Sequence, residues 1–312
     1  MRKGIAVIGD ITLDIIANTT SFPIQKGTSV LSEFVMFEPG GNGNTLIAAQ
    51  RLGGHCISIG YLGNDVQADI SSSALEGEGV DMSKVVRQGT TTTVVTLTDL
   101  HGNHAFHGKS GVGPVLGEEA LGDLDFSSLA AIYFTGYTVH DPLTATVVEI
   151  ACKKAKDAGC SIVLDPGPEY ALITDAQKKK YLSCADYFLL TRDEIPNTGF
   201  KSIQAIREAF PRLRIIEKNG KHGCIAYELG EAEPVVIPAH DDILAVDTSG
   251  AGDSFAGGFL AMLEKGKAFT ECAIVANCVG EVKVQKVGCG RCVPTLEEVQ
   301  SHIAKYNVNV SI

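Results

Sequence analysis

Two aspartates and a group of very small residues occur close together in residues 246–263, VDTSGAGDSFAGGFLAML. Gly250, Ala251 and Gly252 would let another molecule approach the backbone closely. The apolar periodicity that follows predicts a helix, so this loop precedes a helix N-terminus, where free N–H groups and the helix dipole attract anions. Asp253 could simply cap that helix, but capping does not explain the small residues. A phosphate at the N–H groups, beside a carboxylate that accepts a proton from a hydroxyl, would form a kinase site.

Two further glycines, Gly257 and Gly258, fall inside the same predicted helix. Glycine lowers helix stability by about 1 kcal/mol relative to alanine. Their presence therefore indicates that another element, or a ligand, packs tightly against the helix.

A second glycine-rich turn, PGGNGNTLIAAQRLGG over residues 39–54, also opens a predicted helix. Asn42 and Asn44 offer both a donor and an acceptor, which suits recognition of hydroxyl groups better than recognition of phosphate. The alternative is a loop in which Asn and Gly adopt left-handed conformations and cap the helix.

A third group of polar residues, GDITLD over residues 9–14, follows the first predicted strand. The carboxylates of Asp10 and Asp14 can each accept two hydrogen bonds, which suits neighbouring hydroxyls of a ligand. A turn or cap role is the alternative, and for Asp10 the two are equally favoured.

Three other patterns carry less weight. GNHAFHGKS, over residues 102–110, resembles a phosphate loop, but five residues instead of four separate its glycines and no helix is predicted after it. His101, His104 and His107 could ligate a metal, yet strand alternation would send them to different faces, so we favour a structural role. CGRC, over residues 289–292, has redox spacing without a thioredoxin-like context, which favours structural thiols.

The elements that would position these residues are strands and helices in alternation. Apolar runs of strand length, several ending in Gly or Asp, cover residues 5–10, 56–63, 131–136, 161–168, 187–194 and 214–220. Such strands are buried on both faces, as in parallel sheets. Helical patterns lie between them, for example over residues 44–52 and over 143–158, which Gly159 closes. The alternation predicts an α/β fold with a doubly wound, mostly parallel sheet and helices on both faces. Ligands bind such sheets outside the carboxyl ends of the strands.

Two β-like ribbons interrupt this alternation, over residues 29–39 and 91–108. The second contains a turn signal at residues 101–103. We predict that they form a small inserted sheet. The chain has no internal repeat and no clear interdomain linker, so residues 1–312 are predicted to form a single domain.

Composition and charge limit the function classes. The chain of 312 residues is 45% hydrophobic and 20% charged, as in ordinary soluble proteins. Its net charge of −11 argues against a nucleic-acid surface, but not against a nucleotide, whose phosphates backbone N–H groups can hold. The nine cysteines indicate a reduced, cytoplasmic protein. No apolar stretch approaches the ~18 residues needed to span a membrane, and the run at residues 5–8 is too short for a signal peptide.

The three motifs, in this order, resemble those of the ribokinase-like carbohydrate kinases, the PfkB family. The resemblance extends from Gly9 to residues 293–295, and DTSGAGDSFAGGF is its most specific part. PGGNGNTLIAAQRLG departs slightly, because one residue fewer than usual separates Gly41 from Asn44.

The resemblance implies ATP-dependent phosphoryl transfer to a hydroxyl of a small sugar, as in ribokinases or fructokinases. Asp253 would be the catalytic base, and the amides of residues 250–252 would be the anion hole. The implied substrate-binding residues are Asp10, Asp14, Gly40, Gly41, Asn42 and Asn44, with Phe106 and Lys109 from the inserted sheet.

The resemblance also implies the nucleotide site. Thr191 and Glu194 occupy the family's N-x-x-E motif, with Thr in place of Asn, and Glu194 would hold Mg²⁺ through water. The implied ATP-binding residues are Thr191, Glu194, Lys218, Gly220, Gly223, Thr248 and Asn277. Asp247 and Ser249 match the position of a monovalent cation, K⁺, which carbonyls around Gly288 and Cys292 would complete.

In this family the inserted strands, about residues 15–38 and 91–109 here, form a lid over the sugar, and lids pair between subunits, which implies a homodimer. Lid closure would exclude water from the reaction. The same resemblance leaves open a nucleoside kinase, with a slot formed by Phe106, Tyr137 and Phe22. A sugar-phosphate kinase, which needs cations such as Lys26 and Lys109, is also open.

A catalytically silent sugar or nucleotide sensor would require loss of the base or the anion hole, and neither loss is visible in the sequence. A dehydrogenase is disfavoured because no G-x-G-x-x-G follows the first strand. No nucleic-acid or membrane partner is expected.

Overall fold

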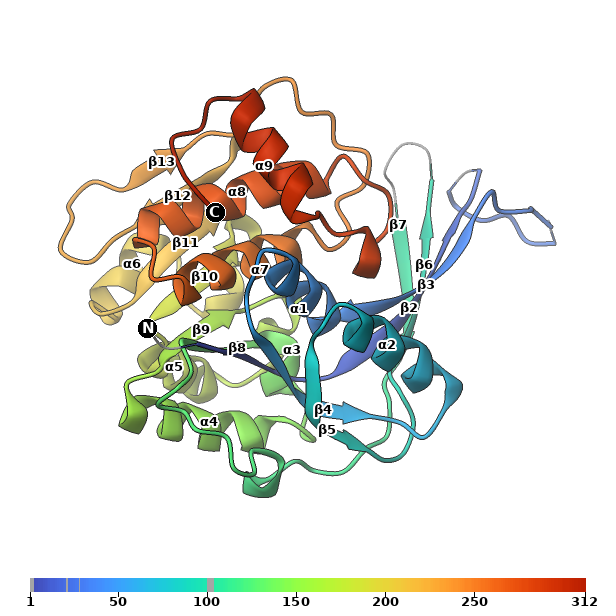
Figure 1. Cartoon of the computed structure of the whole chain (residues 1–312), viewed down its shortest axis with the longest axis horizontal. Coiled ribbons are helices and arrows are strands. Elements are labelled where there is room, and N and C mark those ends of the chain that lie inside the picture. The colour runs from blue at the N-terminus through green and yellow to red at the C-terminus, as the bar shows by residue number, and fades with distance from the viewer. Residues whose placement is uncertain (1–2, 21, 28, 100–103) are drawn as a thin grey trace.

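The structure, a computed structural model, describes residues 3–20, 22–27, 29–99 and 104–312 (Figure 1). The strands are β1 Ile5–Ile8, β2 Ile11–Asn18, β3 Val35–Gly41, β4 Cys56–Leu62, β5 Asp81–Arg87, β6 Thr93–Thr98, β7 His104–Lys109, β8 Ala131–Thr135, β9 Ser161–Asp165, β10 Tyr187–Thr191, β11 Arg214–Lys218, β12 Cys224–Tyr227 and β13 Val235–Ile237. The α-helices are α1 Asn42–Arg51, α2 Val66–Gly77, α3 Gly136–His140, α4 Ala145–Ala158, α5 Asp175–Cys184, α6 Ile203–Ala209, α7 Ala251–Glu264, α8 Phe269–Lys283 and α9 Leu296–Lys305. None of the described helices is long and apolar enough to cross a membrane.

Within the described residues, the large sheet has nine strands in the order β13-β12-β11-β10-β9-β8-β1-β4-β5. The strands from β11 to β5 pair in parallel, and β12 pairs antiparallel with both β11 and β13. The apolar runs identified in the sequence are β1, β4, β8, β9, β10 and β11, so the prediction of a mostly parallel sheet is confirmed. Strands β4 and β5 lie on one side of β1, and β8 and the later strands lie on the other side. The strand order therefore reverses at β1, which creates a switch point beside its carboxyl end.

Alternate residues of each strand enter two separate hydrophobic cores. Ile5 and Val7 of β1 pack with α1, α7 and α8, whereas Ala6 and Ile8 pack with α4, α5 and α6. This arrangement follows from the two-residue period of a strand. The sheet therefore lies between two helical layers, as predicted.

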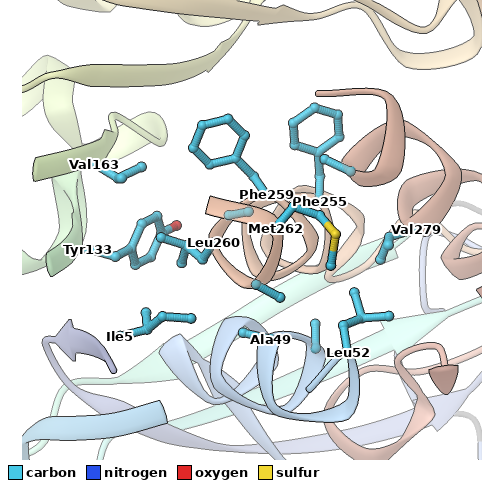
Figure 2. Close-up of a cluster of buried hydrophobic side chains, with 14 of the residues drawn as sticks. Ile5, Ala49, Leu52, Tyr133, Val163, Phe255, Phe259, Leu260, Met262 and Val279 are labelled. Atoms are coloured by element: carbon cyan, nitrogen blue, oxygen red, sulfur yellow. The ribbon is translucent and has the colours of Figure 1, made fainter. Parts of the chain in front are cut away.

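The layer of α1, α7 and α8 contains the helix that begins at the glycine-rich loop. Phe255, Phe259, Leu260 and Met262 of α7 pack between β1, α1 and α8 (Figure 2). The glycines within α7 are explained by close helix contacts: a Cβ on Gly257 would lie 2.6 Å from the Cβ of Ala48 in α1. A Cβ on Gly258 would lie 2.9 Å from Val279 in α8.

The second sheet, in the order β3-β2-β6-β7, projects from one side of the molecule (Figure 1). The prediction of a small inserted sheet is confirmed, although residues 29–34 are not strand and β3 begins only at Val35. The predicted turn at residues 101–103 lies outside the described residues, as do His101 and the side chain of His104. Residues 104–109 form a strand where a phosphate loop would require an open loop, and no helix begins directly after them, so the pattern is not a phosphate loop.

Candidate active site

The carboxyl end of β1 is tied to the helices on either side. Gly9 has φ +143°, and a Cβ there would lie within 2.4 Å of side-chain atoms of Asn42 and Thr138. Asn42 Nδ2 and Thr138 Oγ1 both donate to Ile8 O, at 3.2 Å and 3.0 Å. The predicted sugar-binding residue Asn42 therefore has its amide engaged by β1, with 6% of its surface exposed.

Asp10 follows directly and lies at the switch point of the sheet. Burial, together with the nearby Asp141 carboxylate, raises the pKa of Asp10 to about 6, although the Thr92 hydroxyl opposes the shift. A carboxylate that is costly to ionise needs a partner, and a hydroxyl of a ligand can supply hydrogen bonds to it.

Asp253 lies in the first turn of α7, and its position is fixed from α1. Asn44 Nδ2 donates to Asp253 Oδ2 at 2.9 Å, and Asn44 Oδ1 accepts from Gly290 N–H at 2.6 Å. Burial raises the pKa of Asp253, while Asn44 and the cations of Lys218 and Lys283 oppose the rise. The structure thus brings the glycine-rich motif at residues 39–54 and the one at residues 246–263 into direct contact.

The helix N-terminus beside Asp253 has no side-chain cap. Gly250 adopts a left-handed conformation with φ 69°, which favours glycine. Ala251 N–H donates to Thr248 O at 3.1 Å, so this amide would have to give up a bond to face a phosphoryl group. Within the part of the chain that the structure describes, the amides of Gly250 and Gly252 have no recorded acceptor. A Cβ on Gly252 would lie 3.6 Å from Lys218 Nζ, which puts the open amides next to a cation.

Asp14 of β2 reaches the same site from the small sheet. Its Oδ1 accepts from Thr12 Oγ1 at 2.7 Å, and its Oδ2 accepts from Cys289 Sγ at 3.4 Å. A Cβ on Gly40 of the neighbouring strand β3 would lie 2.1 Å from Asp14 Oδ1. Only glycine at position 40 therefore leaves room for the Asp14 carboxylate. Burial raises the pKa of Asp14, and Asp253 adds a smaller repulsion, which indicates that the two carboxylates share one site.

A buried ion pair that we did not identify from the sequence lies on the nucleotide side. Lys218 Nζ lies 2.6 Å from Asp165 Oδ2, and both side chains are 10% exposed. Burial raises the pKa of Asp165 to about 7, Lys218 opposes that rise, and Glu194 and Asp253 add to it. Burial would lower the pKa of Lys218, but the surrounding carboxylates, led by Asp165, raise it. The signal was available, because Asp165 ends a predicted strand.

The other predicted nucleotide residues are partly engaged within the protein. Glu194 accepts from Thr191 N–H at 2.7 Å and caps the turn after β10. Asn277 Nδ2 donates to Glu281 Oε1 at 3.2 Å. Gly223 is required structurally, since a Cβ there would lie 2.0 Å from Ile237 O, whereas a Cβ on Gly220 would meet nothing within 4 Å.

The residues predicted from the small sheet fall on opposite faces. Phe106 pairs with Thr96, which pairs with Ile16, two residues after Asp14 on the same strand. Phe106 and Asp14 therefore lie on the same face of the small sheet. Lys109 lies across from Thr93, which pairs with Leu13, so its side chain starts on the other face. The register therefore places the side chain of Lys109 on the face opposite Asp14, because strand side chains alternate between faces, and its contact with the substrate stays a prediction.

Two contacts of the loop that follows α8 were also missed. Arg291 forms a two-bond pair with Glu38 of β3, at 2.9 Å and 3.0 Å, and Glu38 is 6% exposed. Cys289 bonds Asp14, as described above, so it contributes to the site and not only to packing. None of the nine cysteines forms a disulfide in the structure, and the structural-thiol interpretation of CGRC stays a prediction.

A separate polar cluster joins α8 to α9. Among the residues that the structure describes, His240, Glu281 and His302 form a group whose potential metal-ligand atoms lie within 4.8 Å of one another. His240 Nδ1 and His302 Nε2 both lie at hydrogen-bond distance from Glu281 Oε2, at 2.8 Å and 2.6 Å. These hydrogen bonds account for the cluster without a metal.

Comparison with known proteins identifies the family to which the chain is similar. The chain matches the description "pfkB family carbohydrate kinase" over residues 2–296. An uncharacterized sugar kinase of Archaeoglobus fulgidus is 29% identical over 249 residues, with 78% of this chain and 97% of that protein covered. The ribokinase of Bacillus subtilis is 26% identical over 317 residues, covering 96% of this chain and 98% of that protein. The crystal structure of a putative ribokinase II from Escherichia coli, in complex with ATP and Mg²⁺, has a TM-score of 0.83 and 19% identity over 98% of this chain and 100% of that chain.

Proposed function

The chain belongs to the PfkB family of carbohydrate kinases, and from this premise we propose that it transfers the terminal phosphoryl group of ATP to a hydroxyl of a small sugar. The observation that carries the proposal is the Asn44–Asp253 contact at 2.9 Å. It holds a half-buried carboxylate beside the uncapped N-terminus of α7 and close to Asp14, where a sugar hydroxyl could be activated.

In this reaction Asp253 accepts the proton of the attacking hydroxyl at a carboxylate oxygen. Asn44 leaves Asp253 only limited freedom to turn, and the amides of Gly250 and Gly252 donate to the charge that develops on the phosphoryl oxygens. Asp10 and Asp14 accept hydrogen bonds from the sugar. Each role uses a carboxylate that is now half-buried or an amide without an acceptor among the described residues.

The residues present also fit ATP and Mg²⁺. Asp165, Glu194 and Asp253 interact with one another electrostatically around Lys218, and carboxylate oxygens are the ligands that Mg²⁺ prefers. Glu194 would hold the metal through water, and Lys218 and the α7 amides would face the phosphates. When bound, Mg²⁺ neutralises charge on the β- and γ-phosphates.

Asp253→Asn tests the proposal. We expect kcat to fall by about 10²–10⁴-fold, the usual contribution of general base catalysis, with sugar affinity by calorimetry nearly unchanged. Asp157→Asn, which alters an exposed pair with Lys153 on α4, is the matched control and should retain full activity. ADP release by Asp253→Asn at the wild-type rate would exclude this mechanism.

A nucleoside kinase is the second candidate, because exposed aromatic rings lie near the site. Phe106 is 56% exposed on the Asp14 face of the small sheet, and Tyr137 is 46% exposed beside Gly167. Such rings could cover a nucleobase. A sugar-phosphate substrate is less well supported, because Lys109 starts on the other face. ADP-release assays over sugars, sugar phosphates and nucleosides distinguish the three classes.

We further propose that the protein is a homodimer through the small sheet. Val35, Phe37 and Val95 are exposed by 55%, 44% and 38%. The register places these side chains on the face opposite Asp14. A second copy of the chain would cover this apolar face and leave the Asp14 face free to act as a lid.

A further inference from the structure

The last residue of α8, Lys283, extends its side chain into the protein toward the loop that precedes α7. Its side chain is fully buried, with 0% exposed. Lys283 Nζ donates to Lys286 O at 3.1 Å and to Asp247 O at 3.5 Å. Burial lowers the pKa of Lys283, and the Asp247 carboxylate opposes this effect. A buried ammonium of this kind is retained only where oxygen atoms surround it.

Asp247 connects the loop before α7 with the loop after α8. Its Oδ1 accepts from Ser249 N–H and its Oδ2 from Gly288 N–H, both at 2.8 Å. Val284 O accepts from Asp247 N–H at 3.1 Å. The carboxylate is therefore occupied by backbone amides, and the carbonyl of Asp247 faces the Lys283 ammonium.

This geometry does not fit the K⁺ site that the family resemblance implies. Asp247 and Ser249 are the residues that the resemblance assigns to the cation, but one carbonyl of each loop, Asp247 O and Lys286 O, accepts from a lysine ammonium. Carbonyl oxygens are the groups that replace the hydration shell of K⁺ in proteins. An ammonium is also a compact monovalent cation, with three donors for the same oxygens.

We propose that the Lys283 ammonium is a built-in monovalent cation beneath the anion-hole loop, so that phosphoryl transfer by this chain does not require K⁺. The proposal rests on the kinase function proposed above. Lys283 is a positioning residue, because it acts through the loops it joins. The loop after α8 supplies Gly290 N–H to Asn44 and Cys289 to Asp14. The charge of the Lys283 ammonium also favours the ionised form of Asp253.

The wild-type protein gives the first test, with KCl compared against tetramethylammonium chloride at equal ionic strength. We expect kcat/KM to agree within twofold and the Tm of the ligand-free protein to be the same in both salts. A saturable activation by K⁺ of fivefold or more, or a Tm raised specifically by K⁺, would overturn the proposal. The Tm measurement holds even without turnover, so absence of ADP release in both salts would count against the kinase function alone.

Variants of Lys283 give the second test. Lys283→Ala leaves a space lined by carbonyls, so kcat should fall at least tenfold in tetramethylammonium, and KCl or NH₄Cl should restore both kcat and Tm in part. Lys283→Met fills the space without charge and should lose activity that K⁺ does not restore. Lys267→Met, whose ammonium bonds Ser311 Oγ at the surface, should behave as wild type.

Rescue by K⁺ distinguishes a cation role from a purely structural one. Wild-type activity and Tm for Lys283→Ala in K⁺-free buffer would overturn the proposal. If Lys283→Ala does not fold in either salt, Lys283→Met decides the question, since wild-type activity in that variant would also overturn it.

Discussion

Asp10, Asp14 and Asp253 illustrate at the residue scale how the protein prepares a site before a ligand is present. Burial raises the pKa of each. Each carboxylate is therefore costly to keep ionised in the folded protein, and hydroxyl groups of a ligand would offset part of that cost. Functional sites commonly retain such strained groups at the expense of stability.

Asp10 gives a prediction for pH dependence. In the unfolded chain it ionises near pH 4, whereas in the folded protein the pKa of Asp10 is about 6. Between these values the folded protein holds a proton that the unfolded chain has lost, so stability falls as the pH rises through this window. The shift of about two units corresponds to about 3 kcal/mol at neutral pH. Asp10→Asn should therefore raise the free energy of unfolding at pH 7.5 by about 1–3 kcal/mol and increase the sugar KM at least tenfold.

Urea denaturation of both proteins at pH 7.5 and pH 5 checks this expectation. The stability gain of Asp10→Asn should shrink at pH 5, because wild-type Asp10 is then largely protonated. A lower stability of Asp10→Asn at pH 7.5 would contradict the burial argument, and an unchanged KM would remove Asp10 from the sugar site.

Much of the site was predictable at this scale, and the limit has a physical cause. Asp253, Asn44 and Asp14 were identified because glycines and carboxylates at strand ends and helix starts are unusual residue choices. Cys289 could not be identified, because its partner Asp14 lies 275 residues away in the chain. Lys283 could not be identified, because carbonyl acceptors leave no side-chain signal.

At the element scale, the site depends on how closely α1 and α7 approach. Asn44 begins one helix and Asp253 the other, and their contact at 2.9 Å requires the two axes to lie close together. Gly257 allows this approach, since a Cβ would lie 2.6 Å from Ala48 Cβ and 2.7 Å from Thr45 O. The sequence indicated a tight neighbour for this glycine, but only the structure shows that it is α1.

Gly257→Ala should therefore damage both stability and activity. The added methyl group forces α7 away from α1, which costs about 1–3 kcal/mol as in other overpacked cores, and the shift separates Asn44 from Asp253, so kcat should fall. Thermal denaturation and ADP release measure the two effects.

Gly77→Ala is the matched control, since Gly77 ends α2 and a Cβ there would meet nothing within 4 Å. It should leave kcat unchanged and stabilise the protein by up to about 1 kcal/mol, the difference in helix propensity. Equal behaviour of the two variants would show that the spacing of α1 and α7 does not control the site.

At the scale of the whole molecule, strand alternation determined which parts were predictable. Continuous apolar strands identified the large sheet, because a strand buried on both faces needs no polar face. The small sheet was predicted at the right place in the chain, but its extent was not. Residues 29–34 have the residue pattern of a strand and yet lie outside β3. The face of the sheet on which Lys109 lies was not predictable from the sequence, because the pairing of β6 with β7 sets it.

The small sheet leads to a prediction about assembly. Its face opposite Asp14 exposes Phe37 and Val95, and large exposed apolar patches commonly mark interaction sites. If a second copy covers this face, Phe37→Asp should place an unpaired carboxylate in the interface and yield monomers. Sedimentation should then change from about twice the chain mass of 32.9 kDa to the chain mass itself. Val236→Asp, on edge strand β13 with Val236 63% exposed, is the control and should remain dimeric.

Because the sheet would lose its partner but keep Asp14, Phe37→Asp should raise the sugar KM more than it lowers kcat. A wild-type protein that sediments as a monomer at micromolar concentration would exclude the dimer and leave the lid to act within one chain.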